Sequence, residues 1–179
     1  MTGTELAALL ESFSRLPYDG EAIDQREHSL QCAGLALAAR EDDAFVLACA
    51  LHDVGRAPSV AARLPNLPHE RAGERFLDEV LGARAAALVG AHVAAKRYLV
   101  AVDAEYRELL SETSIRSLER QGGPLSSAEL AEFGALPYRD EALRLRRYDD
   151  RAKVPGAQTP SINEIVRIYE RYSAAAARP

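Results

Sequence analysis

Residues 44–53 read Ala-Phe-Val-Leu-Ala-Cys-Ala-Leu-His-Asp, and Asp42 or Asp43 precedes them as a candidate helix N-cap. The run is apolar on nearly every helical face, so it has no polar face to turn to water. A helix of this kind belongs in the centre of a bundle. The pair His52-Asp53 ends it, and a carboxylate buried there needs a partner.

Further helices are expected on both sides of this central helix. Periodicity and end signals predict them at residues 4–13, 23–40, 69–80, 83–98, 103–110, 114–120 and 139–150. Ser126 with Glu129, and Ser161 with Glu164, form capping boxes that start two more. Residues 55–68 hold three prolines and are predicted to be a loop.

No alternating strand pattern and no internal repeat accompanies these helices. The sequence therefore predicts an all-α fold, an irregular helical bundle. With 179 residues the chain fits one domain, residues 1–179, with a core of about residues 18–160 between N- and C-terminal flanking helices.

Composition excludes some partners and predicts a compartment. The formal net charge of −5 gives no basic face for nucleic acid. Cys32 and Cys49 lie in apolar helical stretches, as buried thiols in a reducing compartment do. We expect a cytoplasmic protein without a membrane partner, because no secretory signal is seen and apolar runs such as 45–51 are short. The oligomeric state is not indicated.

The four histidines fall on four predicted helices: His28, His52, His69 and His92. A lone helical histidine is usually a surface residue or a satisfied core residue. Four of them around a His-Asp pair, with none left over, favour a metal site built from inward-facing side chains of a bundle. Imidazole and carboxylate without thiolate suit iron, manganese or zinc.

The order His…His-Asp…His…His…Asp resembles the HD-domain superfamily, whose bridging aspartate lies between two metal ions. The resemblance implies a dinuclear site in the core with six ligands. Asp53 would be the bridge, and the others would be His28, His52 and Asp149 at one metal, and His69 and His92 at the other. Asp150 competes for the last position. Asp149 is preferred because it lies four residues before Lys153, as in similar proteins.

Longer segments resemble one branch of that superfamily, the mixed-valent di-iron oxygenases that cleave carbon–phosphorus bonds, with myo-inositol oxygenase as a remoter relative. The matching segments are 18–28, 92–99, 117–124 and 145–156, and the resemblance covers about residues 18–160. It implies two iron ions, Fe(II)/Fe(III), and dioxygen as co-substrate. The small organophosphonate would be a 1-hydroxyphosphonate such as 2-amino-1-hydroxyethylphosphonate, giving phosphate and a carboxylate (glycine).

The resemblance also assigns roles around the metals. Tyr18 would close over the iron, Glu21 would pair with the cationic amine of the substrate, and Gln25 would share this polar lid. Lys96, one helical turn after His92, would bind the phosphonate. Taken alone, the lid residues would be loop residues and Lys96 an exposed helix lysine.

Four more residues complete the expected substrate contacts. Ser114 and Ser117 lie three apart on one helix face and suit an anion, but suit solvent or a helix cap equally well. Gln121 belongs to a matching segment. Arg56 stands where the family member that acts on the aminophosphonate has histidine. It suits a phosphonate contact through two parallel hydrogen bonds, or is a solvated residue at the start of the Pro-rich loop. Because of this departure, other 1-hydroxyphosphonates are also candidate substrates.

Two other functions use the same metal ligands. An ordinary HD phosphohydrolase would attack a phosphate ester with a metal-bound hydroxide. A non-catalytic HD module would only bind a ligand, although an intact ligand set weighs against it. The lid residues Tyr18 and Glu21, together with Lys96, favour the oxygenase.

Overall fold

The computed structural model describes residues 1–18 and 20–176 of the chain. Within them the regular structure is helical, apart from an isolated bridge between Pro17 and Asp24, so the all-α prediction is confirmed. The elements follow in this order: α1 (Gly3–Ser12), η1 (Phe13–Arg15), α2 (Gln25–Ala38), α3 (Asp43–Leu51), η2 (Val54–Arg56), α4 (Pro58–Arg63), α5 (His69–Leu81), α6 (Ala83–Val102), α7 (Ala104–Glu108), α8 (Glu112–Arg120), α9 (Ser127–Gly134), α10 (Arg139–Arg151) and α11 (Ile162–Ala176).

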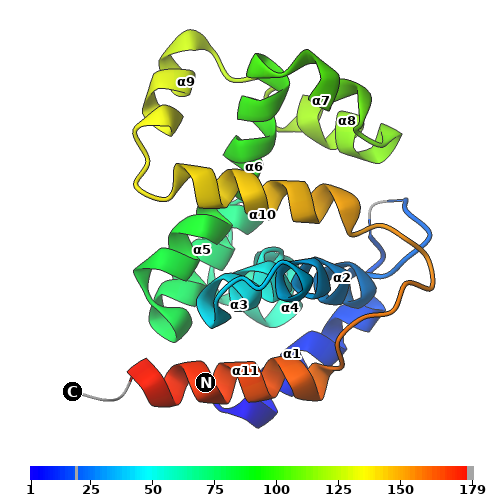
Figure 1. Ribbon diagram of the computed structural model, residues 1–179, viewed down its shortest axis with the longest axis vertical. Helices are drawn as coiled ribbons and strands as arrows, with labels where there is room; N and C mark the ends of the chain where they lie inside the picture. The colour runs from blue at the N-terminus through cyan, green and yellow to red at the C-terminus, as the bar shows by residue number, and fades with distance from the viewer. Residues whose placement is uncertain (19, 177–179) are drawn as a thin grey trace.

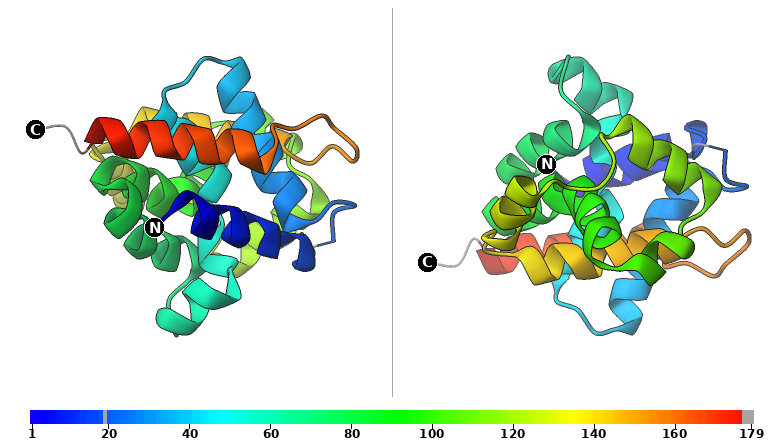
Figure 2. Two further views of the ribbon diagram at one scale, coloured as in Figure 1. Left: turned by 90° about the horizontal axis from the view of Figure 1, so that it is seen from below. Right: turned by 90° about the horizontal axis from the view of Figure 1, so that it is seen from above.

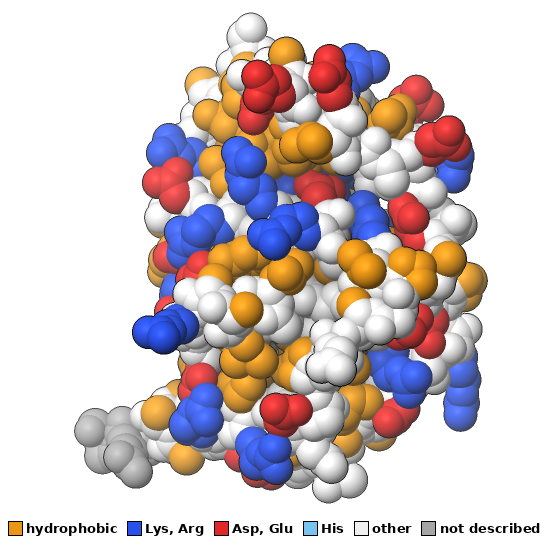
Figure 3. All heavy atoms as spheres, turned by 45° about the vertical axis from the view of Figure 1, so that its right-hand side comes forward, with side chains coloured by type: hydrophobic (Ala, Val, Ile, Leu, Met, Phe, Trp, Pro, Cys, Tyr) orange, Lys and Arg blue, Asp and Glu red, His pale blue; other side chains and the backbone are white. Residues whose placement is uncertain are grey.

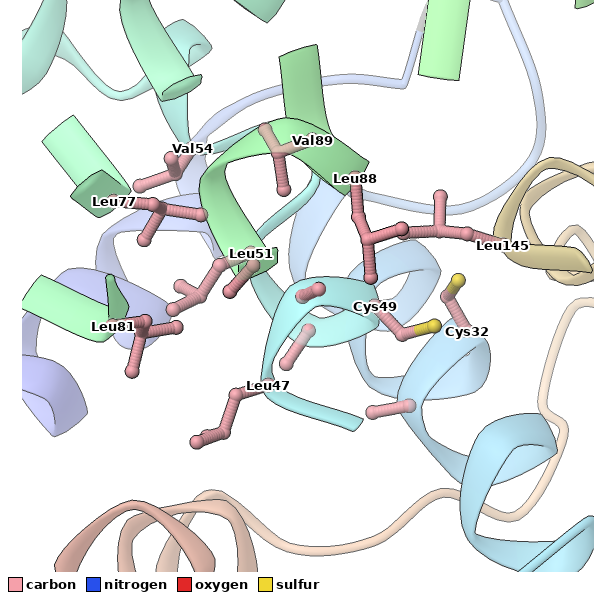
Figure 4. Packing of buried hydrophobic residues seen from close by; sticks show 14 of the residues in the cluster. Cys32, Leu47, Cys49, Leu51, Val54, Leu77, Leu81, Leu88, Val89 and Leu145 are labelled. Carbon is pink, nitrogen blue, oxygen red and sulfur yellow. The ribbon is translucent and has the colours of Figure 1, made fainter. Parts of the chain in front are cut away.

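Helix α3 is the central helix, as its composition predicts. Asp42 is its N-cap and accepts a 3.0 Å hydrogen bond from the amide of Phe45. Every residue from 44 to 51 is buried. Figure 4 shows its side chains among those of the surrounding helices, which contribute Cys32 from α2, Leu77 and Leu81 from α5, Leu88 and Val89 from α6, and Leu145 from α10. Both cysteines are buried free thiols.

The remaining helices form two groups around this centre. α1 and α11, the two ends of the chain, lie side by side on one side of the bundle (Figures 1 and 2). α7, α8 and α9 lie on the opposite side, and α10 crosses between the groups (Figure 1). This arrangement brings α2, α3, α5, α6 and α10 together in the interior.

Three differences between the predicted elements and the structure concern the core and the residues near His52 and His92. The central helix ends at Leu51, so His52 and Asp53 lie on the turn that follows it. The predicted loop 55–68 contains the short helix α4, because Pro58 occupies its first turn, where proline needs no amide hydrogen bond. α6 continues past 98 to Val102, where Leu99 and Val100 pack into a small separate cluster.

Helix α6 bears on the expectation that the apolar runs are too short to cross a membrane. Within residues 1–18 and 20–176 it is the one helix long and apolar enough, by length and composition, with 20 residues and an apolar window of 18 residues whose mean hydropathy is 1.3. It packs against α3, α5 and α10, and 61% of the apolar window is buried. The core helix of a bundle meets the same criteria because protein surrounds it.

Gly55 marks the closest approach of η2 to the start of α5. A Cβ atom there would lie 1.9 Å from the carbonyl oxygen of His69. We expect Gly55→Ala to lower the free energy of unfolding by about 1–3 kcal/mol, because backbone must shift to admit the methyl group. Gly134→Ala is the control, since no atom lies within 4 Å of its added Cβ. Equal urea midpoints for both variants would contradict the expectation.

Candidate metal centre

The four histidines converge in two pairs. His28 of α2 and His52, just after α3, place their Nε2 atoms 3.0 Å apart. His69, the first residue of α5, and His92 in α6 place theirs 3.2 Å apart. Three of the rings are fully enclosed, whereas the side chain of His69 is 17% exposed. The helices of the interior thus bring all four imidazoles to one point.

The outer nitrogen of each enclosed ring faces a backbone carbonyl. The Nδ1 atoms of His28, His52 and His92 lie 2.8, 2.8 and 2.6 Å from the carbonyl oxygens of Ala152, Cys49 and Val89. A carbonyl only accepts, so each Nδ1 carries the hydrogen, and in a neutral ring Nε2 is left with its lone pair. Lone pairs about 3 Å apart repel each other unless a cation lies between them. This tautomer and orientation are those of metal-binding histidines.

Asp53 lies between the two pairs. Its Oδ2 is 3.7 Å from Nε2 of His52, while its Oδ1 is 3.1 Å from Nε2 of His69 and 3.8 Å from that of His92. Asp53 therefore belongs to both groups whose ligand atoms all lie within 4.8 Å of one another: His28, His52 and Asp53, and Asp53, His69 and His92. Such a carboxylate is placed to bridge two cations.

Asp149 and Asp150 occupy different environments. Asp149 Oδ1 is 3.3 Å from Nε2 of His28, and Oδ2 is 3.9 Å from that of His52. Asp150 instead contacts Arg146 and Tyr106. The geometry therefore supports Asp149 over Asp150 as the sixth ligand.

The charges of this centre hold its carboxylates ionised. Burial raises the pKa of Asp53, but Arg56, His52 and His69 outweigh it and keep the pKa well below its usual value. Burial likewise opposes the charged form of His52, while Asp53 and Asp149 raise its pKa to about 10, so without a metal ion a proton occupies the place beside Nε2 that a metal cation would take. Burial and then His69 hold the pKa of His92 well below normal, so that ring is neutral. Two buried carboxylates beside a neutral imidazole are an environment suited to cations.

Tyr18 covers the centre. Its ring stacks on His28 with 3.8 Å between centroids, and its hydroxyl lies 3.4 Å from Oδ1 of Asp149. Burial and then Asp149 raise the pKa of Tyr18 well above its usual value. The structure therefore places Tyr18 against two of the candidate ligands, His28 and Asp149.

The other two expected lid residues are placed differently. Gln25 is not on a lid: it is buried, begins α2, and donates through Nε2 to Oδ2 of Asp53 at 3.0 Å. Glu21 accepts a 2.7 Å hydrogen bond from the hydroxyl of Ser111, the N-cap of α8. It is not among the residues that line the cavity at the metal centre.

That cavity, about 30 Å³, has four basic side chains and two carboxylates in its lining. Lys96 donates to the Ser117 hydroxyl at 2.7 Å, and Lys153 to the Ser114 hydroxyl at 2.6 Å. Burial, and next the charge of Arg146, lower the pKa of Lys96 to about 7. The lining combines cations, hydroxyls and candidate ligands: Tyr18, Asp53, Arg56, His69, His92, Val93, Lys96, Thr113, Ser114, Ser117, Gln121, Arg146, Asp149 and Lys153.

Sequence reasoning missed two of these cations. Arg146 is buried on α10 and donates to Oδ2 of Asp149 at 2.7 Å. Its position three residues before Asp149, on one helix face, was the available signal. From the sequence, Lys153 helped only to choose between Asp149 and Asp150. Its position four residues after a candidate ligand was the signal that it lies near the same cavity.

The comparisons agree with this centre. A family model described as "HD domain" matches residues 26–154, most of the chain and every candidate ligand. The chain belongs to the HD-domain family. Within that family it belongs with the phosphonate oxygenases, as the identities below show.

Two relatives of the chain carry names that state an activity. The chain is 37% identical over 167 residues to hydroxymethylphosphonate dioxygenase of Gimesia maris, covering 90% of this chain and 83% of the relative. It is 35% identical over 159 residues to [1-hydroxy-2-(trimethylamino)ethyl]phosphonate dioxygenase (glycine-betaine-forming) of Leisingera caerulea, covering 86% and 81%. Dioxygenase relatives imply a metal and dioxygen, and the donor set of this HD domain fits a metal pair.

We expect His92→Ala to lose one of the two metal ions. The variant keeps His28, His52 and Asp149 but leaves His69 as the only imidazole at the second position. Metal analysis of the purified variant, beside the wild type, measures the change. Leu99→Ala is the control for damage to α6, because Leu99 lies nearer the C-terminal end of the same helix and outside the cavity. Two ions retained in the His92 variant would contradict the ligand assignment.

Proposed function

We propose that this chain is a di-iron dioxygenase that cleaves the carbon–phosphorus bond of a 1-hydroxyphosphonate. The observation that carries the proposal is a cavity lined by basic side chains and hydroxyls that opens onto Asp53, Asp149 and the His69/His92 pair, with the His28/His52 pair on the other side of Asp53. The six proposed ligands are His28, His52, Asp53, His69, His92 and Asp149. Two iron ions there, of the Fe(II)/Fe(III) kind, would supply the redox chemistry with dioxygen.

The chain's own task is to hold a phosphonate dianion beside the metals. Lys96 and Lys153 each donate to a serine hydroxyl that also lines the cavity, so ammonium and hydroxyl groups face the same anion. Arg56 and Arg146 add two guanidinium groups, which bind phosphonate oxygens through charge-assisted hydrogen bonds. Gln121 contributes an amide to the same wall. The cavity of about 30 Å³ holds little more than a water molecule, so these side chains must move apart to admit the phosphonate.

Tyr18 keeps water from the reacting carbon. Its ring lies flat on His28 and its hydroxyl reaches Asp149, so it covers the side of the centre that holds these two residues. A substrate whose hydroxyl approaches this position would displace the phenol from Asp149 and remain covered by the ring. The overall change is balanced: one hydroxyphosphonate and one dioxygen give one carboxylic acid and one phosphoric acid.

The charges of the cavity favour a substrate without a cationic group. Its carboxylates are Asp53 and Asp149, both proposed ligands, whereas Glu21 is engaged by Ser111 behind the lining. An ammonium group would therefore meet Lys96, Lys153 and two arginines with no free counter-charge. We propose that hydroxymethylphosphonate is preferred over 2-amino-1-hydroxyethylphosphonate and over its trimethylammonium analogue.

The decisive experiment is anaerobic reconstitution with Fe(II), followed by dioxygen and each of these three phosphonates in turn. We expect oxygen-dependent release of phosphate, with formate, glycine or glycine betaine as the second product. The Asp53→Asn variant, treated identically, controls for free iron. Absence of oxygen-dependent phosphate from all three substrates would overturn the proposal, and oxygen-independent hydrolysis of phosphate esters would favour a phosphohydrolase. Preference for either cationic substrate would overturn the specificity alone.

A further inference from the structure

The two carboxylate oxygens of Asp53 have different partners. Oδ2, which faces His52, accepts a hydrogen bond from the neutral amide of Gln25 at 3.0 Å. Oδ1, which faces His69 and His92, forms a 3.0 Å ion pair with Nε of Arg56. The carboxylate is therefore polarised by a neutral donor on one side and by a full positive charge on the other.

This difference acts on any two cations that Asp53 joins. An oxygen that shares its electrons with a guanidinium group donates less to a metal ion, and the guanidinium charge also repels that ion. Both effects fall on the His69/His92 position. The opposite position has the additional carboxylate of Asp149, 3.3 Å from His28, whose other oxygen is paired with Arg146. Donation by the two oxygens of Asp53 thus favours the higher metal charge at His28/His52 and the lower one at His69/His92.

From this juxtaposition we infer that Arg56 is a positioning residue for the metal pair, which makes the two metal positions unequal through Asp53, in addition to lining the substrate cavity. The inference rests on the proposed metal centre. It assigns to Arg56 an effect that is present without substrate, whereas a residue that only clamps phosphonate has no such effect. Gln25 is its neutral counterpart on the other oxygen.

Anaerobic titration with Co(II), in the absence of substrate, separates these roles. Wild type is expected to bind two ions in two unequal steps, and His92→Ala identifies which step belongs to the His69/His92 position. Arg56→Gln should tighten that step by about tenfold, the size usual for residues that contact a ligand. Arg56→Lys keeps the charge and should leave the step within about threefold of wild type.

The possible outcomes distinguish the role inferred for Arg56 from the proposed metal centre on which it rests. Failure of the wild type to bind two Co(II) ions would remove the metal centre itself. Two ions bound with the same two constants in wild type and Arg56→Gln would overturn the inference while leaving the centre intact. The KM for hydroxymethylphosphonate, measured on the iron-loaded variants, provides the second readout. A change confined to KM would show that Arg56 contacts only the substrate.

Discussion

Asp53→Asn should lose both metal ions and, with them, all oxygen-dependent turnover. Asp53 is the one carboxylate within 4 Å of histidines from both pairs in residues 1–18 and 20–176, so its charge serves both positions. An amide keeps the shape but gives up the negative charge and one acceptor oxygen. We expect activity to fall by more than the roughly 100-fold seen when a partner of a ligand is removed. Metal analysis and the phosphate assay measure the two losses.

Asp149→Asn and Asp150→Asn form a matched pair for the same measurement. The first carboxylate touches His28, whereas the second contacts Arg146 and Tyr106. Only Asp149→Asn should lower the metal content. If Asp150→Asn lowers it instead, the sixth ligand is misassigned, and if Asp53→Asn retains two ions, Asp53 is not a bridge.

Lys96→Ala should raise the KM for the phosphonate by about 10- to 100-fold, because a charge-assisted hydrogen bond to a dianion is lost. The metal content should not change, since Lys96 contacts Ser117 and not a histidine. The pH dependence gives a second signature. Because burial and Arg146 lower the pKa of Lys96 to about 7, the ammonium group is present below that pH and is lost as the pH rises through it. The value of kcat/KM should therefore decline above pH 7 towards that of Lys96→Ala.

Lys96→Arg is the control, because its guanidinium stays charged throughout the range. We expect this variant to lose the decline above pH 7 even if its KM is higher. A decline that persists unchanged in Lys96→Arg would assign it to another group.

The sequence predicts the all-α fold well because its strongest signals are local. Residues 44–51 leave no polar face, and Asp42 and the two capping boxes fix helix starts through bonds that span three residues. The helix α4 was missed because prolines 58, 65 and 68 suggest a loop, although Pro58 begins a helix. A proline in the first turn of a helix is compatible with it, so the residues after Pro58, and not Pro58 itself, decide whether a helix forms there.

The candidate site likewise has a part that the sequence predicts and a part that it does not. The histidines and Asp53 could be named because their types and order are informative. The role of Gln25 could not, because its contact with Asp53 joins residues 28 positions apart. The partner of Glu21 lies 90 positions away, on Ser111. The first contact depends on how α2 packs on α3, and the second on how the residues before α2 lie against the start of α8, so no local pattern encodes either.

The backbone acceptors behind the enclosed histidines have a consequence for how the chain tolerates substitution. Carbonyl oxygens at positions 49, 89 and 152 exist whatever side chains those positions carry. Many metal-binding histidines are aimed by a carboxylate, which a single substitution removes. Here no single side-chain exchange that leaves the helices in place can release these three rings. Residues of the cavity wall can therefore change, and the substrate with them, while these three imidazole rings keep their orientation.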